Sequence, residues 1–410
     1  MIAGPVLATA VAHRKLSGVY RHGKGTWAVT WDDYVDIEAD LYRSFTVFDR
    51  LPLVLITDRF VNAKVTPRVE SNTQLCYSNP DVIAQVVQDA RDYFDGKGLK
   101  PGSLAMGDHF AVVPMDRRMW CRCAGCRRWM LDEPTLGKGQ FSNNAASDYV
   151  FQFANAIARE VRKTHPDKFI STLGYWEYCY PPANVKLEPN INVGLCFGSR
   201  GWGASYKTGN NDLDILNSWR GRPEKPDLYL WLYYCFPSLT AMLQKYRMFP
   251  AFFAPDIVEH MKIFRQAGIR GIKYEPSYIA NERQSPLLDQ LEFYVTWKLA
   301  DNPDLDGNAL IDEFFTRYYG PAAKPMRAFY MLCAEIWRDT KRPAGVGEPE
   351  MSWNYLGTPA RMEQLGAYMA DALRRAEEKG TETEQRRVAL FKEGIWEFMR
   401  KGFDAYHTAK

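Results

Sequence analysis

Short apolar runs alternate with longer amphipathic stretches from the start of the chain to about residue 284, and this alternation predicts strands separated by helices. The predicted strands are residues 6–12, 73–77, 104–115 (one buried strand or two short ones), 169–176, 192–197, 228–234 and 269–274. Helical periodicity marks residues 80–94 with Asn79 as the N-cap, 146–163, 238–246 and 256–266. Repeated strand-then-helix order indicates a parallel sheet with crossover helices.

Seven strands with short connections predict an α/β fold of the TIM type, a (β/α)8 barrel that lacks or rearranges its first strand. Residues 19–68 do not fit one βα unit, because they are aromatic and acidic and have no clear turn residues. We interpret them as an elaborated loop with some helix. The barrel is expected to occupy residues 1–284.

Residues 285–410 lose the strand signal and read as long amphipathic helices. The helical stretches are residues 285–300, 307–320, 322–339, 358–379 and 382–406, with a Pro- and Gly-containing loop at 341–350. We therefore expect a helical C-terminal region after the barrel.

Composition narrows the class of protein. The chain has 410 residues, 46% of them hydrophobic, and a formal net charge of +3, which is typical of a globular protein. The balanced charge and the lack of a groove-reading motif argue against a nucleic-acid partner. No apolar stretch is long enough to span a membrane, and the apolar start has no basic region that would indicate a signal peptide. Oligomeric state is left open.

Three cysteines form a tight C-x-C-x-x-C pattern in a knuckle loop, residues 114–130. A fourth, Cys76, lies at the end of a predicted strand, so Cys76, Cys121, Cys123 and Cys126 form a candidate all-thiolate set for a structural zinc ion. A disulfide between two of them is the alternative. A closed all-thiolate site leaves no open position for catalysis, so no cofactor is expected for the chemistry itself. The arginines of this loop are interpreted as a solvated basic surface.

Several ordered motifs resemble the bacterial family known as domain of unknown function 4838. They are QLCYSNP, PMD followed by WCRCAGC, SDYVFQFANAIAREVRKTHPD, GYWEYCYPP, GIRGIKYEPS and EFFTRYYGPAAKPMRAFY, and they extend from about residue 74 to residue 330. The resemblance implies a glycoside-hydrolase-like barrel, similar to hexosaminidases and α-glucuronidases, with a helical region after it. It also implies a periplasmic or secreted location and a polysaccharide or oligosaccharide as substrate.

Hydrolysis of a glycosidic bond needs two carboxyl groups that face each other across the sugar. Three carboxylates follow predicted strands, where the catalytic residues of such folds lie: Asp116, Glu177 and Glu275. We expect Asp116 and Glu275 to form the pair, with Glu177 in reserve. The alternative for each is a helix cap or an ion-pair partner.

Aromatic residues at the same predicted strand ends are candidates for stacking on a sugar ring. The predicted substrate-binding residues are His13, Trp120, Tyr175, Trp176, Tyr233, Tyr234 and Tyr274, whereas His109 reads as a buried core histidine. The sequence thus predicts a glycoside hydrolase-like, carbohydrate-active protein. The alternatives are a non-catalytic carbohydrate-binding barrel and a truncated, inactive barrel.

Overall fold

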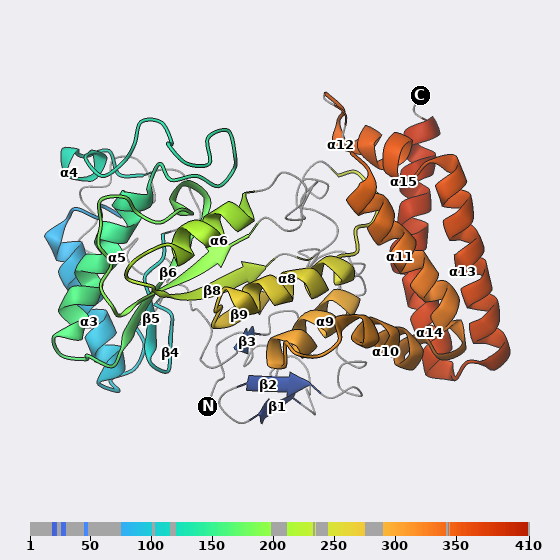
Figure 1. Ribbon diagram of the computed structural model, residues 1–410, viewed down its shortest axis with the longest axis horizontal. Coiled ribbons are helices and arrows are strands. Elements are labelled where there is room, and N and C mark those ends of the chain that lie inside the picture. The colour runs from blue at the N-terminus through green and yellow to red at the C-terminus, as the bar shows by residue number, and fades with distance from the viewer. Residues whose placement is uncertain are drawn as a thin grey trace.

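The computed structural model describes residues 19–22, 26–29, 45–47, 75–100, 103–114, 120–197, 211–232, 234, 245–274, 290–341, 343 and 345–408, the first three of these segments by their backbone alone. Seven described strands form one sheet in the order β3-β9-β8-β7-β6-β5-β4, and β1 (Val19–His22) and β2 (Thr26–Val29) form a separate hairpin (Figure 1). The strands of the sheet are β3 (Phe45–Val47), β4 (Ala105–Met106), β5 (His109–Ala111), β6 (Phe169–Gly174), β7 (Ile191–Cys196), β8 (Asp227–Leu232) and β9 (Gly271–Tyr274).

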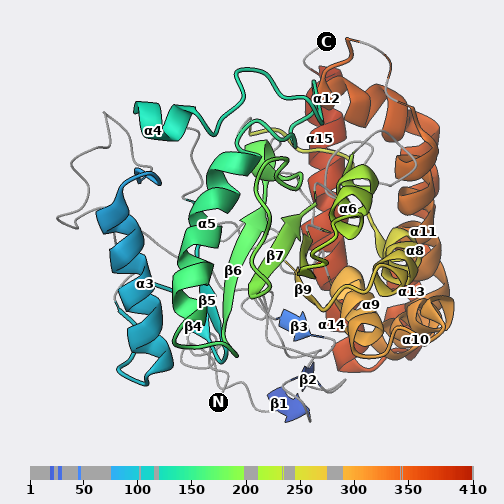
Figure 2. The same cartoon turned by 60° about the vertical axis from the view of Figure 1, so that its left-hand side comes forward.

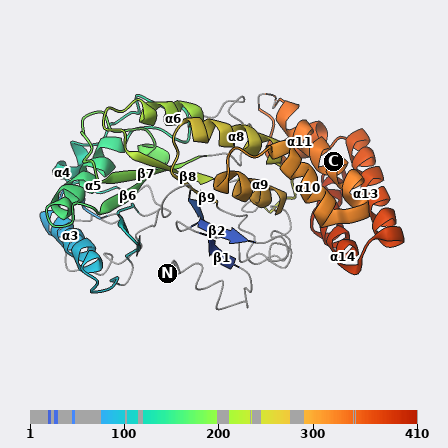
Figure 3. The same cartoon turned by 60° about the horizontal axis from the view of Figure 1, so that its bottom comes forward.

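Strands β5 to β9 run parallel to one another, whereas β4 and β3 are antiparallel to their neighbours. The carboxyl ends of β5 to β9 therefore share one edge of the sheet. Helices cross over between the parallel strands: α5 (Ser147–Arg162) joins β5 to β6, α6 (Asp212–Arg220) joins β7 to β8, and α8 (Ala254–Gln266) joins β8 to β9. Figure 3 shows these helices along the convex side of the curved sheet.

The central strands are covered on both faces. Every residue of β7 is buried, and so is every residue of β6 after Phe169. Strands buried on both faces read as near-continuous apolar runs rather than as alternating patterns. Here β6 and β7 depart from that pattern at Ser171, Thr172 and Asn192, which are buried as well. Two of these side chains contact a buried histidine: His109 Nδ1 lies 3.1 Å from both Ser171 Oγ and Asn192 Nδ2.

Helix α3 (Pro80–Phe94) packs on α5 at the β4 side of the sheet, as Figure 2 shows. The Asn79 side chain accepts a hydrogen bond of 3.0 Å from the Asp81 backbone N–H, which confirms the predicted N-cap. Proline at the first helical position adds to the signal, because its fixed φ suits the start of a helix.

The described chain after β9 consists of helices with short connections, and it lies on the β9 side of the sheet (Figure 1). Its elements are α9 (Gln290–Asp301), α10 (Gly307–Tyr319), η5 (Gly320–Ala322), α11 (Ala323–Asp339), α12 (Glu348–Glu350), η6 (Met351–Leu356), α13 (Pro359–Lys379), α14 (Glu382–Phe391), η7 (Lys392–Trp396) and α15 (Glu397–Thr408). Packed aromatic rings join this part of the chain to the loop before α8, with the Tyr330 ring centroid 4.2 Å from that of Phe252 and 4.8 Å from that of Phe391.

The predicted TIM-type (β/α)8 barrel is wrong. Among the described residues, β3 and β4 each pair with a single strand, so the sheet is open and does not close into eight strands. One physical reason lies at residues 75–77, which were counted as part of a strand but form a turn. Cys76 and Tyr77 are buried there by the knuckle loop and α5, so their apolar character reflects loop packing rather than strand pairing.

The front of the chain also differs from expectation. Where residues 19–68 are described they form the short strands β1, β2 and β3, and no helix is described among them. The expected strand at residues 6–12 and most of the expected helix at 238–246 lie outside the described residues. In the part of the chain that the structure describes, no helix combines the length and apolar character needed to cross a membrane.

Candidate functional site

The knuckle loop brings the four predicted cysteines together. Cys76 lies in the turn that leads into α3, and the other three lie just before and within the short helix α4 (Ala124–Arg127). The backbone N–H groups of Cys126 and Arg127 donate to the Cys123 carbonyl at 3.0 and 2.9 Å, which closes the C-x-x-C turn. Both segments pack against α5, so two loops distant in sequence meet at one point.

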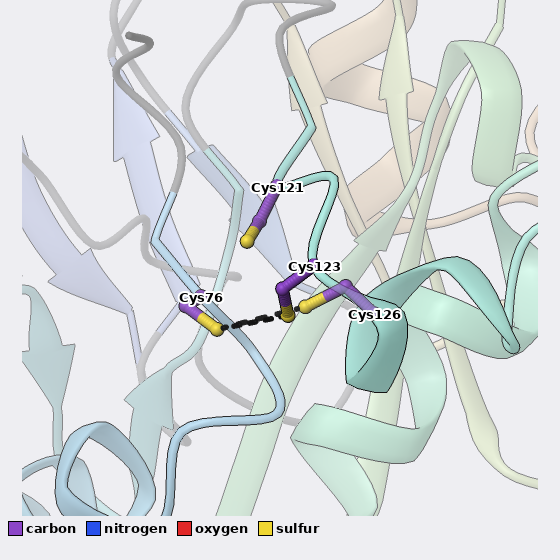
Figure 4. Close-up of side chains that lie close together, drawn as sticks. All are labelled: Cys76, Cys121, Cys123 and Cys126. Carbon is purple, nitrogen blue, oxygen red and sulfur yellow. Dashed lines mark hydrogen bonds between the residues drawn. The ribbon is translucent and has the colours of Figure 1, made fainter. Parts of the chain in front are cut away.

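The four sulfur atoms all lie within 4.8 Å of one another. Figure 4 shows them turned toward a common centre, with Cys76 Sγ 3.6 Å from Cys123 Sγ and 3.7 Å from Cys126 Sγ. A disulfide has a sulfur–sulfur distance of about 2.05 Å, so these thiols are not bonded to one another. Sulfurs at the corners of a tetrahedron around a zinc ion lie roughly 3.8 Å apart. The arrangement is therefore compatible with a structural metal and differs from a disulfide.

Ser78 forms a polar contact with three of these thiols. Its Oγ lies 3.4 Å from Cys76 Sγ and 3.3 Å from the sulfurs of Cys123 and Cys126. A Cβ built on Gly125 would lie 2.6 Å from the same Oγ, so only glycine lets α4 approach this close. Hydrogen bonds to ligand sulfurs are a common second layer around protein metal sites.

The pKa values of three thiols in the cluster are shifted in different directions. Burial raises the pKa of Cys121 and of Cys126. Burial acts on Cys123 too, but hydrogen bonds from Ser78, Cys126 and Cys76 outweigh it and lower its pKa to about 6. Without a cation the cluster therefore favours a thiolate at Cys123 and protonated thiols at Cys121 and Cys126. A divalent ion reverses this preference, because coordination deprotonates every ligand thiol.

Glu177 is the one predicted catalytic carboxylate among the described residues. It lies in η3 (Trp176–Tyr178), three residues beyond the end of β6, at the carboxyl edge of the sheet. The indole N–H of Trp120 donates to Glu177 Oε2 at 2.7 Å. Trp120 directly precedes Cys121, so the knuckle loop contacts this carboxylate.

Backbone hydrogen bonds tie the loop before α5 to the segment around Glu177. The N–H of Asn143 donates to the Trp176 carbonyl at 2.7 Å, and that of Ala146 donates to the Glu177 carbonyl at 2.6 Å. Trp176 has a φ of 51°, in the left-handed region that bulky residues avoid. A strained residue held by its surroundings next to a polar strand end is a frequent property of functional sites.

An exposed aromatic group lies beside Glu177. Phe141 is 60% exposed, and its ring lies 5.5 Å from that of Trp176 with 8° between the planes. Tyr175 meets Phe141 edge on, with ring centroids 6.0 Å apart. Flat apolar faces next to a carboxylate are suited to a ligand with an apolar face and polar edges.

The other predicted site residues are placed as follows. Tyr234 is buried, and its hydroxyl lies 2.5 Å from His260 Nδ1. Tyr274 is the last residue of β9, and its side chain is not described. Four predictions fall outside the described residues: Asp116, Glu275, His13 and Tyr233. Glu275 follows β9 directly in the sequence, as the predicted strand end requires.

Sequence reasoning missed Phe141, Ser78 and Gly125. Phe141 lies in a polar segment without periodicity, so no pattern distinguished it. Ser78 follows Cys76 by two residues, and a hydroxyl so close to a candidate ligand was the available signal. The exposed arginines Arg122 and Arg127 agree with the predicted solvated surface.

Comparisons with curated proteins and with family profiles gave different results. No curated protein matches the chain at a significant level. A sequence profile described as Domain of unknown function (DUF4838) matches residues 58–331, which is more than half of the chain and includes the four cysteines and Glu177. This protein therefore belongs to the DUF4838 family.

Proposed function

We propose that this protein is carbohydrate-active and cleaves a glycosidic bond with a pair of carboxyl groups. The observation that carries the proposal is the placement of Glu177 at the carboxyl edge of a parallel sheet, where ligands of such folds bind. Its carboxylate is held by the Trp120 indole beside the partly buried ring of Trp176 and the exposed ring of Phe141.

Three carboxylates enter the proposal. Glu177 follows β6, Glu275 follows β9 in the sequence, and β6 and β9 point the same way in the sheet. Asp116 belongs to the knuckle loop, two residues after the described segment that contains β5. In the proposed reaction one carboxylic acid protonates the leaving oxygen and one carboxylate acts as nucleophile or as base toward water. The aromatic side chains would stack on the apolar face of a pyranose.

We further propose that the four thiols hold one structural zinc ion. The sulfur separations of 3.6 and 3.7 Å support this, because they are close to the edge of a zinc–sulfur tetrahedron, roughly 3.8 Å. Cys76, Cys121, Cys123 and Cys126 would fill all four positions, so the ion would stabilise the loop and take no part in the reaction.

A panel of aryl glycosides and of acidic and amino-sugar oligosaccharides tests the function. The parent protein is compared with Asp116→Asn, Glu177→Gln and Glu275→Gln, and Glu133→Gln, an exposed carboxylate of the neighbouring loop, is the matched control. We expect hydrolysis by the parent and by the control, and loss of at least 100-fold in kcat for the two carboxylates that act. Each variant is checked for unchanged melting temperature.

Other outcomes are informative. Binding without hydrolysis by the parent and by every variant favours the alternative, a non-catalytic carbohydrate-binding protein. If neither binding nor hydrolysis is found with any sugar of the panel, the proposed function is wrong.

A further inference from the structure

We propose that Trp120 is a positioning residue that couples the four-thiol site to Glu177. The metal site would fix Cys121, Cys121 would fix its neighbour Trp120, and the Trp120 indole would hold the carboxylate. The inference rests on the proposed function in treating Glu177 as catalytic, and it rests on the proposed zinc ion. The coupling itself is a property of the protein without substrate.

The contact at the end of this route is short and directed. The Trp120 Nε1–H donates to Glu177 Oε2 at 2.7 Å, a length typical of a hydrogen bond to a charged acceptor. An indole has one N–H donor and no acceptor, so it can hold an ionised carboxylate but offers nothing to stabilise the proton of a carboxylic acid. The position of this N–H therefore influences the orientation of the Glu177 carboxylate.

Two routes lead from the thiols to the Trp120 ring. The first is the peptide bond between Trp120 and Cys121. Cys121 is fully buried, and the Cα atoms of the two residues lie about 3.8 Å apart, so a fixed Cys121 restricts the position of Trp120. The second is Tyr149 on α5: its hydroxyl donates to the carbonyl of Leu75, the neighbour of Cys76, at 3.3 Å, and its ring meets the Trp120 ring edge on at 5.5 Å. On its other side Trp120 meets Tyr178, which follows Glu177, at 5.9 Å.

The metal matters for the position of Trp120 because the segment around this residue has little regular structure. Apart from the four residues of α4, residues 120–146 have no regular secondary structure. Three of the six exposed large apolar side chains in the described chain lie between α4 and α5: Leu131, Leu136 and Phe141. A loop with so small a core depends on a cross-link for its position. Losing the ion should therefore displace Cys121 and with it the indole.

The test follows the indole N–H group of Trp120 by NMR in full-length protein with 15N-labelled tryptophan. Trp120→Phe removes the N–H but keeps a flat ring, so the peak that it deletes is assigned to Trp120. We expect Glu177→Gln to shift this peak upfield, because the acceptor loses its charge. We expect removal of zinc with a chelator, and Cys121→Ser, to shift or broaden the same peak.

Two other tryptophans are internal controls, because their indoles also donate at known distances. Trp219 donates to the Cys179 carbonyl at 2.7 Å, and Trp353 donates to the Arg247 carbonyl at 2.9 Å. Their peaks should stay in place when zinc is removed, which shows that the fold survives. Cys333→Ser, a fully buried cysteine outside the cluster, is the matched cysteine control and should leave the Trp120 peak unchanged.

The possible failures are distinguishable. A Trp120 peak that does not move when zinc has left, as verified by metal analysis, overturns the coupling. A peak insensitive to Glu177→Gln overturns the positioning role, and a protein that never binds zinc overturns both the metal site and this inference. If the coupling is found but no sugar is hydrolysed, only the proposed function fails.

Discussion

The knuckle side of the sheet and the helical region after it are held together in different ways. Beside the sheet, four thiols and one hydroxyl hold two loops that bury few large apolar side chains. In the helical region, rings such as Tyr330 and Phe391 pack with Phe252, from the loop before α8, in a core that periodic apolar helix faces create. Segments with regular structure can rely on packing, whereas a functional loop must keep its exposed groups and needs another source of order.

The largest effect is expected from a change in the thiol cluster. Cys126→Ser should abolish zinc binding and lower the melting temperature strongly, because a structural zinc contributes about 10–16 kcal/mol to the folding of small zinc domains. Cys333→Ser on α11 should keep the metal. Metal content and thermal unfolding are measured for both variants. Equal zinc content and equal melting temperatures in the two variants would contradict a special role of the cluster.

Truncation in the aromatic core should be the next largest effect. Phe391→Ala removes a ring that is 2% exposed and packs on Phe252, Phe329 and Tyr330, so we expect a loss of about 3–5 kcal/mol in the free energy of unfolding. Zinc content should stay the same. Denaturant unfolding gives the energy, and concurrent loss of zinc in the folded variant would contradict the separation of the two regions.

A smaller effect is expected from Gly125→Ala. The new Cβ would lie 2.6 Å from Ser78 Oγ and 2.9 Å from Ser78 Cβ, so we expect a cost of about 1–3 kcal/mol and weaker zinc binding. Adding Ser78→Gly should recover part of the stability. The control is Gly221→Ala, where the nearest atoms lie at 3.4 and 3.6 Å and φ is −72°. Chelator competition measures zinc affinity, and equal affinity in the two alanine variants would contradict the packing argument.

The smallest effect concerns charge on the surface of α13. Hydrogen bonds from Arg375 and Arg374 hold the pKa of the Asp371 carboxyl below its ordinary value of 3.8. Because the folded pKa is lowered, this carboxylate stabilises the fold above pH 3.8 and the contribution disappears as the pH falls through the folded pKa. Asp371→Asn should lower the melting temperature slightly at neutral pH, and the difference should vanish in strong acid. A difference that grows with acidity would contradict this.

The sequence predicted most of the helices and strands, but it did not predict that the sheet stays open. Helices α3, α5 and α8 and strands β6 to β9 were expected within a few residues, since Asn79, Gly268 and the apolar runs mark them clearly. The barrel failed because the pairing of edge strands as short as β3 leaves little trace in a hydrophobic pattern. Whether a strand lies at an edge is decided by tertiary contacts.

The part of the candidate site that could be predicted is the part whose ligands lie at a short, regular spacing in the sequence. The C-x-C-x-x-C pattern identified three thiols and the neighbouring strand prediction added Cys76, although that segment is a turn. The contact between Trp120 and Glu177 joins residues 57 positions apart and has no local signal. Phe141 was missed for the same reason, because only the folded loop places it beside Trp176.

X-ray absorption at the zinc edge, with metal analysis of protein purified without added metal, tests the central claim most directly. The account predicts one zinc ion per chain with four sulfur ligands at about 2.3 Å. A protein without metal, a first shell that contains nitrogen or oxygen, or a disulfide among Cys76, Cys121, Cys123 and Cys126 would contradict it.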